Sequence, residues 1–189
     1  MPLYKSLLIV FTTTSLFSFE ESFVYNDNVK IVYRDYGPSS ADPILLVQGL
    51  GGQLINWPDH IINFLIENNF RPIVFDNRDS GLSSRLNSNL FSEENKAKTI
   101  NRTYLRYYLR LPINGPYTLD DMANDAVAIL DHLDIQKSHL LGISMGGMIA
   151  QILAANHPER IKTFTLIASS ISVPSPLNGP RRDVRKLVM

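Results

Sequence analysis

Short apolar runs alternate with amphipathic segments along this 189-residue chain, and this alternation limits the folds open to it. Continuous apolar runs are typical of strands buried on both faces of a sheet, and apolar residues three and four positions apart are typical of helices. Their order predicts an α/β fold, a mostly parallel sheet with helices on both faces. The expected strands are 23–25, 29–36, 44–47, 72–75, 139–143 and 164–168, and the expected helices are 57–67, 119–133 and 145–156.

The first nineteen residues form a separate segment. Lys5 precedes an uncharged stretch that contains the apolar run 7–11. This layout is typical of a secretory signal peptide, and it is shorter than the roughly 20 apolar residues of a membrane span. We therefore expect a signal peptide at 1–19, no stable membrane span, and a secreted or periplasmic protein. The alternative is a first β-strand in a cytoplasmic protein, since Phe, Val and Thr suit strands.

Composition excludes several classes of function. The 18 basic and 18 acidic residues cancel, so the chain has no excess positive charge with which to bind nucleic acid. The chain has no cysteine, and its four histidines have no metal-ligand spacing, so no metal site is expected. With 44% hydrophobic residues, the chain has enough apolar side chains to fill a globular core.

A serine lies at the junction between an expected strand and an expected helix. Residues Gly142 to Gly146 fit the pattern G-x-S-x-G around Ser144. In this context the pattern predicts a strained turn that exposes the serine, with glycines where neighbouring backbone leaves no room for a Cβ. The N-terminus of the following helix favours a negative charge at the serine. Ser144 is therefore the candidate nucleophile.

A glycine-rich segment follows the strand 44–47 and predicts a second part of the same site. Acyl transfer needs two backbone N–H groups directed at the developing oxyanion. One comes from the residue after the nucleophile and the other from the loop after an earlier strand, so we assign Met145 and Leu50. Gly49 and Gly51 flank Leu50. The loop lacks the G-x-G-x-x-G spacing and the lysine of nucleotide sites, which disfavours phosphate binding.

Four blocks of sequence occur in this order: Gly49 to Pro58, Phe75 to Ser83, Gly142 to Gln151 and His157 to Arg160. Together they resemble the serine esterase-like branch of the α/β-hydrolase fold superfamily. The resemblance implies hydrolysis of a carboxylic ester or related bond in a small molecule through an acyl-enzyme, with no metal or organic cofactor. It also implies that the polar residues of the second block support the loops around the site. Gln48 departs from the histidine that many relatives carry ahead of the glycine.

The resemblance covers only the N-terminal part of such a fold, residues 20–170. In this fold the triad acid and histidine follow the serine, and no residue after Ser144 is placed to serve as either. We expect a fold truncated before the cap and last strands, with 171–189 as the start of a cap region or a disordered tail. Three hypotheses follow: a serine hydrolase represented by this part, a catalytically inactive remnant or binding module, and a structural protein with a chance motif.

Two expectations concern apolar residues. Leu54 and Trp57, together with Leu50 and Met145, predict an apolar pocket for the acyl group. The strand 164–168 is expected at the edge of the sheet with apolar side chains exposed, which would allow self-association.

Overall fold

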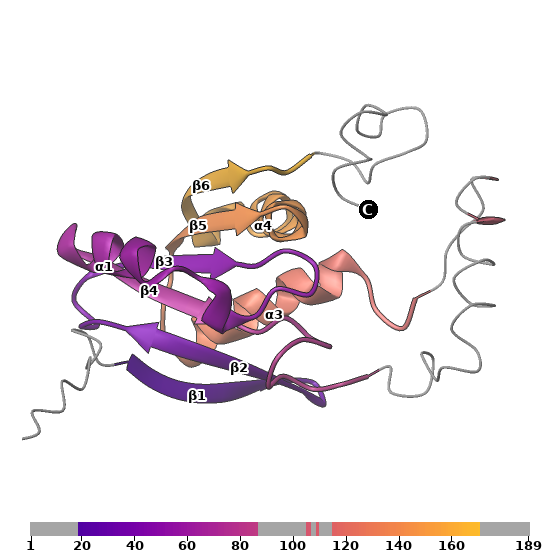
Figure 1. The fold of residues 1–189 in the computed structure, drawn as a ribbon, viewed down its shortest axis with the longest axis horizontal. Helices are drawn as coiled ribbons and strands as arrows, with labels where there is room; N and C mark the ends of the chain where they lie inside the picture. Colours follow the sequence, from indigo (N-terminus) through magenta and orange to yellow (C-terminus); the bar gives the residue numbers. More distant parts are fainter. Residues whose placement is uncertain (1–18, 87–104, 107–108, 110–114, 171–189) are drawn as a thin grey trace, which may run out of the picture.

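The computed structural model describes residues 19–86, 105–106, 109 and 115–170. These residues build a six-stranded sheet in the order β1-β2-β4-β3-β5-β6 (Figure 1). The expected signal peptide, apart from Phe19 at the start of β1, and the expected cap or tail lie outside the described residues. The strands are β1 Phe19–Asn26, β2 Val29–Tyr36, β3 Asp42–Val47, β4 Phe70–Phe75, β5 Ser138–Ile143 and β6 Ile161–Ile167. The helices are α1 Asp59–Glu67, α3 Leu119–His132 and α4 Met145–Asn156, and short 3-10 turns cover Leu54–Asn56 and Pro158–Arg160.

The α/β class and the mostly parallel sheet are confirmed. β4, β3, β5 and β6 run parallel to one another, whereas β2 pairs antiparallel with β1 and with β4. The β1–β2 hairpin turns at Asp27, which adopts the left-handed region with φ 52°, as expected for Asn and Asp in tight turns. Because parallel strands end at the same edge, the loops after β3, β4 and β5 meet there.

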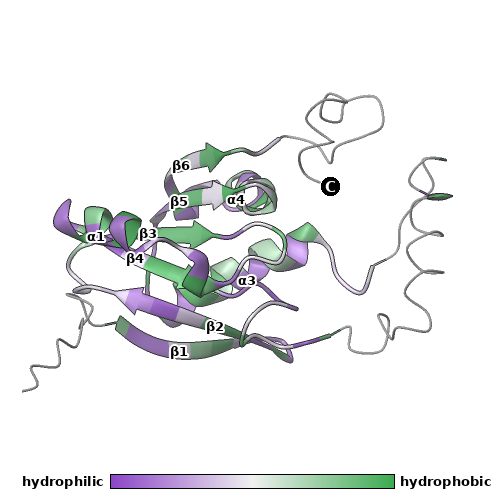
Figure 2. Cartoon of the chain, in the orientation of Figure 1, coloured by the Kyte–Doolittle hydropathy of each residue, from purple (hydrophilic) through white to green (hydrophobic). Residues whose placement is uncertain are grey.

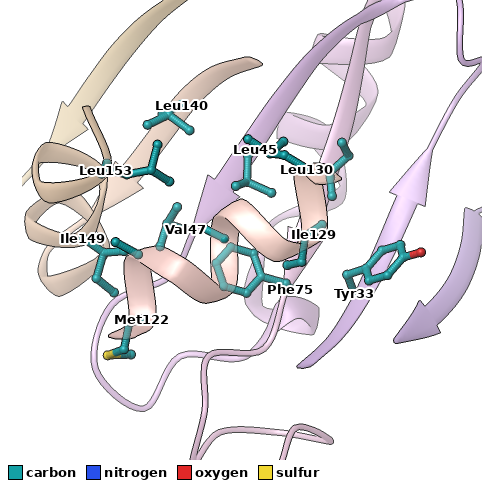
Figure 3. Close-up of a cluster of buried hydrophobic side chains, with 14 of the residues drawn as sticks. Tyr33, Leu45, Val47, Phe75, Met122, Ile129, Leu130, Leu140, Ile149 and Leu153 are labelled. Atoms are coloured by element: carbon teal, nitrogen blue, oxygen red, sulfur yellow. The ribbon is translucent and has the colours of Figure 1, made fainter. Parts of the chain in front are cut away.

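The core has two layers, one on each face of the sheet. Leu45 and Val47 of β3 pack against α3 and α4, where Ile129 and Leu153 are fully buried (Figure 3). Their neighbours along β3 point the other way, and Leu46 joins the second layer, under α1. Alternate residues of β3 therefore need apolar partners on opposite faces, which explains why the strand is a continuous apolar run. In Figure 2 the hydrophobic colour accordingly dominates β3 and β4 at the centre of the sheet.

The buried face of helix α1 differs from the expected one. Ile62 and Leu65 are buried, but Phe64 is 60% exposed. Successive helical residues turn by about 100°, so Phe64 lies about 200° from Ile62 on the outer surface. The sequence expectation had placed Phe64 on the buried face.

Strand β6 forms one edge of the sheet, as expected. Phe164, Leu166 and Ile167 are 49%, 38% and 43% exposed. Pairing of two copies through this edge stays a prediction. Among the described residues, no helix combines the length and apolarity needed to cross a membrane.

Polar side chains connect β3, β5 and β6 at the N-terminal ends of the strands. His139 Nε2 lies 3.1 Å from Asp42 Oδ2, and His139 Nδ1 lies 2.7 Å from Thr163 Oγ1. Lys162 Nζ donates to Asp42 Oδ1. The hydrogen bonds from Lys162 and, more weakly, from His139 lower the pKa of Asp42 against the opposing effect of burial.

We predict that this cluster stabilises the fold only while Asp42 is ionised. Because the pKa of Asp42 is lower in the folded state, its contribution is present above its unfolded pKa of about 3.9 and is lost as pH falls through the folded pKa. Asp42→Asn should lower the thermal midpoint by about 2 °C near neutral pH, since such exposed pairs contribute little. The difference between wild type and variant should be smaller at about pH 3 than near neutral pH. An equal difference at both pH values in a thermal melt followed by circular dichroism would contradict the prediction.

Candidate active site

Ser144 occupies the turn between β5 and α4 and is exposed. Its backbone has φ 54° and ψ −119°, a conformation that a residue with a side chain rarely adopts. Two backbone hydrogen bonds hold the turn: Ser144 N donates to Ile167 O at 2.9 Å, and Gly147 N donates to Ser144 O at 3.0 Å. Although Ser144 is the N-cap residue of α4, its side chain makes no capping hydrogen bond. The hydroxyl of this exposed residue is thus not bound to the amides of α4.

The glycines of the motif are required by close backbone contacts. A Cβ on Gly142 would lie 2.5 Å from Gly146 O. A Cβ on Gly146 would overlap Val47 O and lie 2.6 Å from Gln48 O. Only a residue without a side chain lets the first turn of α4 approach the end of β3 this closely.

The loop after β3 lies directly beside the serine. A Cβ on Gly49 would be 3.2 Å from Ser144 Cβ and 3.7 Å from its Oγ. Gly51 adopts φ 72°, and Gly52 N donates to Gly49 O at 3.1 Å, which closes a tight turn. The Leu50 side chain is 85% exposed. The structure therefore brings Gly49 and Ser144 together, with Met145 at the start of α4, where helix N–H groups have no partner within the helix.

The loop after β4 holds the loop after β3 through three hydrogen bonds. Leu54 N donates to Asp76 Oδ1 at 2.7 Å, Asn77 Nδ2 donates to Gln48 O at 3.1 Å, and Ser80 Oγ donates to Gly52 O at 2.7 Å. The other carboxylate oxygen of Asp76 accepts from Leu82 N at 2.8 Å. This agrees with the expectation that the block Phe75 to Ser83 supports the loops around the site.

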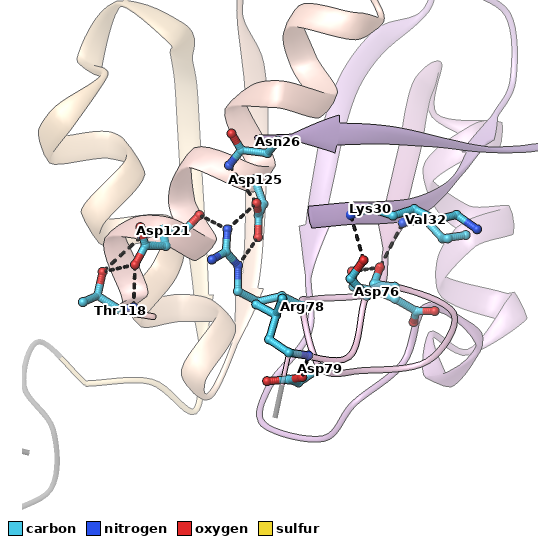
Figure 4. Close-up of polar contacts among 12 residues, drawn as sticks. Asn26, Lys30, Val32, Asp76, Arg78, Asp79, Thr118, Asp121 and Asp125 are labelled. Carbon is cyan, nitrogen blue, oxygen red and sulfur yellow. Dashed lines mark hydrogen bonds and ion pairs between the residues drawn. The ribbon is translucent and has the colours of Figure 1, made fainter. Parts of the chain in front are cut away.

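A buried ion pair connects the same loop to α3 (Figure 4). Arg78 donates to both oxygens of Asp125 at 2.7 Å and to Asp121 O at 3.2 Å, and Asn26 Nδ2 donates to Asp125 Oδ1 at 2.8 Å. The side chains of Arg78 and Asp125 are only 7% and 1% exposed. Burial alone would lower the pKa of Arg78, but its hydrogen bonds and charge interaction with Asp125 outweigh this effect and raise that pKa.

Sequence reasoning missed this network, and also Tyr117, whose ring centroid lies 5.3 Å from the Arg78 guanidinium carbon. Burial and a hydrogen bond to Asp79 raise the pKa of Tyr117 to about 12. One signal was present in the sequence: Asp125 stands next to Ala126 and three residues after Met122, on the buried face of an amphipathic helix. A charge at such a position requires a buried partner.

A pocket of about 500 Å³ opens beside these loops. Its lining residues are Gly49–Gly51, Asn77–Ser80, Gly115, Tyr117–Leu119, Met122 and Met145.

Leu54 and Trp57 differ from their expected role as pocket residues. They are 3% and 8% exposed and pack in the core layer under α1. The turn Leu54–Asn56 carries the chain back over that face of the sheet, away from the pocket.

The four histidines are all described, and none is hydrogen-bonded to Ser144. His139 pairs in register with Ile44 near the start of β3, at the opposite end of the strands from the serine. His132 ends α3 against the Tyr33 ring, His157 follows the last residue of α4, and His60 is exposed in the first turn of α1. Within the described residues, no group of three or more His, Asp or Glu side chains is arranged to hold a metal ion.

The chain is similar in sequence to known proteins. A sequence model described as alpha/beta hydrolase fold matches residues 42–188. Rhodomycin D methylesterase DnrP of Streptomyces peucetius is 30% identical over 144 residues, which are 76% of this chain and 40% of that protein. 3-Oxoadipate enol-lactonase 2 of Acinetobacter baylyi is 29% identical, over 77% of this chain and 43% of that protein. The chain thus spans about 40% of the length of such relatives.

A solved structure shows the same likeness in three dimensions. The structure described as "Est816 as an N-Acyl homoserine lactone degrading enzyme" has a TM-score of 0.57 and 28% identity. The alignment covers 78% of this chain and 45% of that one.

The close contact at Gly146 predicts a large loss of stability for Gly146→Ala. The added Cβ meets rigid backbone of β3, so we expect a cost of about 3 kcal/mol, measured by urea unfolding. Gly51→Ala is the matched control: its Cβ would meet nothing within 4 Å, so only the left-handed φ should cost about 1 kcal/mol. Equal losses of stability in the two variants would show that the backbone contact at Gly146 does not determine the cost.

The two amide hydrogen bonds of Asp76 predict that its carboxylate cannot be replaced by an amide. In Asp76→Asn, one of the two oxygens that accept a backbone N–H is replaced by an NH₂ group, so that two donors face each other. The free energy of unfolding should therefore fall by about 2 kcal/mol. Asp27→Asn, at an exposed turn position that suits Asn, should change it by less than about 0.5 kcal/mol. Urea unfolding of the two variants tests this, and a cost for Asp76→Asn no larger than that of the control would contradict it.

Proposed function

Because the chain belongs to the alpha/beta hydrolase fold family, we propose that it carries the nucleophile half of a serine hydrolase. The reaction is hydrolysis of a carboxylic ester or related bond in a small molecule, through an acyl-enzyme on Ser144. No metal or organic cofactor takes part in this chemistry.

The observation that carries the proposal is the strained, exposed conformation of Ser144. A serine at an N-cap ordinarily hydrogen-bonds the helix amides, but the Ser144 side chain makes no such bond at φ 54°. Strain of this kind persists only where the surrounding structure enforces it, and it is concentrated at functional sites. Here Gly142, Gly146 and the hydrogen bond to Ile167 O enforce it.

The surroundings of Ser144 suit an oxyanion. We assign the N–H groups of Met145 and Leu50 as its donors. Met145 supports this because it opens α4, whose N-terminus carries a partial positive charge. For Leu50 the support is that the preceding residue, Gly49, lies against Ser144. Loss of one such donor typically costs about 2.7–4 kcal/mol of transition-state stabilisation.

The relatives support the substrate class. Their names describe a methylesterase and an enol-lactonase, and the solved structure is described as a lactone-degrading enzyme. Open-chain and cyclic esters react through the same attack on a carbonyl carbon. We therefore extend the proposal to both.

A second function, ligand binding without turnover, is favoured by the positions of the histidines. Serine needs an adjacent base to become a strong nucleophile. Among the described residues, no histidine is hydrogen-bonded to Ser144. A chain with this pocket and no base would bind an ester and release it unchanged.

A fluorophosphonate probe distinguishes the two functions. The hydrolase proposal predicts covalent labelling of Ser144, detected by peptide mass spectrometry, because such probes react with serines activated by a base and an oxyanion hole. Ser144→Ala should abolish the labelling, whereas Ser39→Ala, at an exposed loop position, should leave it unchanged. A folded wild-type chain that is not labelled would contradict the hydrolase proposal and favour binding without turnover.

A further inference from the structure

A hydroxyl, an imidazole and a carboxylate are connected near the N-terminal ends of β6, β5 and β3, at the other end of β5 from Ser144. Thr163 Oγ1 lies 2.7 Å from His139 Nδ1, and His139 Nε2 lies 3.1 Å from Asp42 Oδ2. One ring nitrogen of the imidazole therefore contacts an alcohol, and the other contacts an acid. A hydroxyl within hydrogen-bond reach of a base that a third group orients is the arrangement that activates a nucleophile.

The charge of Asp42 determines which ring nitrogen of His139 carries the proton. The hydrogen bond from Lys162 lowers the pKa of Asp42, burial opposes this decrease, and the hydrogen bond from His139 adds to it. An ionised carboxylate only accepts hydrogen bonds, so the proton of neutral His139 lies on Nε2. Nδ1 then has a lone pair directed at the Thr163 hydroxyl. In this tautomer the imidazole is able to take a proton from the alcohol.

An irregularity in β6 brings the hydroxyl to the imidazole. The register between β5 and β6 shifts between Ser138 and Leu140, where β6 has one more residue than β5. Two residues of β6, Lys162 and Thr163, therefore lie opposite His139 in place of one. Such bulges re-aim side chains and are concentrated next to functional sites. Both side chains accordingly reach the same polar cluster.

The cluster is open to a small ligand. Thr163 is exposed, and the side chain of His139 is 19% exposed. A pocket of about 460 Å³ adjoins the cluster, and its wall includes Pro43, next to Asp42, and Lys162, next to Thr163. The ammonium group of Lys162 has three N–H donors, of which Asp42 accepts one. It places a positive charge at the cluster, which suits the negative charge that develops on a carbonyl oxygen during acyl transfer.

We propose that Thr163 is a site of acylation, separate from Ser144, that takes an acyl group from small aryl esters. Thr163 Oγ1 forms a bond to the carbonyl carbon while its proton passes to His139 Nδ1. The bond from that carbon to the aryloxy oxygen then breaks, and the aryloxide leaves with the proton that His139 held. The products are an acyl-threonine and a phenol. Thr163 and His139 are catalytic residues, and Asp42 is a positioning residue.

Acetylation by para-nitrophenyl acetate tests the proposal in the full chain with Ser144→Ala, which removes the other candidate nucleophile. Proteolytic cleavage after Glu159 separates position 144 from Thr163, and peptide mass spectrometry with fragmentation distinguishes Thr163 from Thr165. Thr165 is the internal comparison, because it is exposed on the same strand and no described histidine is bonded to its hydroxyl. Thr163 should be acetylated at least about 100-fold faster than Thr165, since a general base contributes a factor of this size.

His139→Gln keeps a polar side chain but removes the base, so it should slow the acetylation of Thr163 to the rate of Thr165. His157→Gln is the matched control, because His157 follows α4 and lies against Glu159 instead of a hydroxyl. It should leave the rate unchanged. Thr163→Ser keeps a hydroxyl at the bulge and should retain acetylation at this position.

Asp42→Asn tests the positioning role through the tautomer of His139. If Lys162 continues to donate to the amide oxygen, the NH₂ group faces Nε2 and moves the ring proton to Nδ1. Nδ1 then no longer accepts the proton of Thr163, so acetylation should slow as in His139→Gln. Nitrogen-15 NMR of histidine-labelled chains should report the Nε2–H tautomer with Asp42 and the Nδ1–H tautomer with Asn. A merely structural role of Asp42 would leave the tautomer unchanged.

Equal rates for Thr163 and Thr165, no acetylation of Thr163 in the folded chain, or a rate that His139→Gln leaves unchanged would overturn the proposal. If His139→Gln fails to fold, the comparison of the two threonines within one chain still decides. All acetylation is measured without the Ser144 hydroxyl. Failure of this proposal is therefore distinguishable from failure of the hydrolase proposal, which fluorophosphonate labelling of Ser144 tests.

Discussion

The structure of the site depends on the close approach of α4 to the end of β3. Gly146 makes this approach possible, because any Cβ there would overlap the Val47 carbonyl. Once the helix begins this near the sheet, the connection from β5 has only one residue in which to turn, and Ser144 takes the left-handed conformation. The packing energy of α4, with Ile149 and Leu153 fully buried, offsets the local strain. The burial of α4 side chains in the core thus stabilises the turn that exposes Ser144.

A second constraint is that the backbone of loops at the ends of parallel strands has no hydrogen-bond partners within the sheet. The loop after β4 supplies them, through Asp76, Asn77 and Ser80, and is itself anchored to α3 by Arg78 and Asp125. Hydrogen bonds between such buried polar groups fix one arrangement of the two loops. The role that we propose for the loop after β3, directing an amide at a reacting oxygen, needs such rigidity more than it needs added stability.

Much of this could be predicted from the sequence, for physical reasons that differ by element. The run Ile44 to Val47 identified a central strand because both of its faces need apolar partners, and G-x-S-x-G identified the turn because each glycine answers a steric contact. Leu54 and Trp57 were misplaced, because hydrophobicity does not tell a pocket from the core. The link between Asp79 and Tyr117 joins residues 38 positions apart. No periodicity or motif predicts such a pair, which exists only after the sheet has brought the two loops together.

The two helices that begin at this end of the sheet, α3 and α4, differ in how their N-termini are capped. At α3 the first turn is closed by its own side chains, since Thr118 and Asp121 cap one another, and the carboxylates of Asp120 and Asp121 offset the partial positive charge of the helix end. At α4 the N-cap residue is also a hydroxyl residue, yet its side chain makes no capping bond and the first turn has no acidic residue. The partial positive charge at the N-terminus of α4 is therefore not offset by acidic side chains in its own first turn, whereas that of α3 is. In the hydrolase that we propose, this difference would draw the carbonyl oxygen of a bound ester toward α4 rather than α3, and so orient the ester beside Ser144.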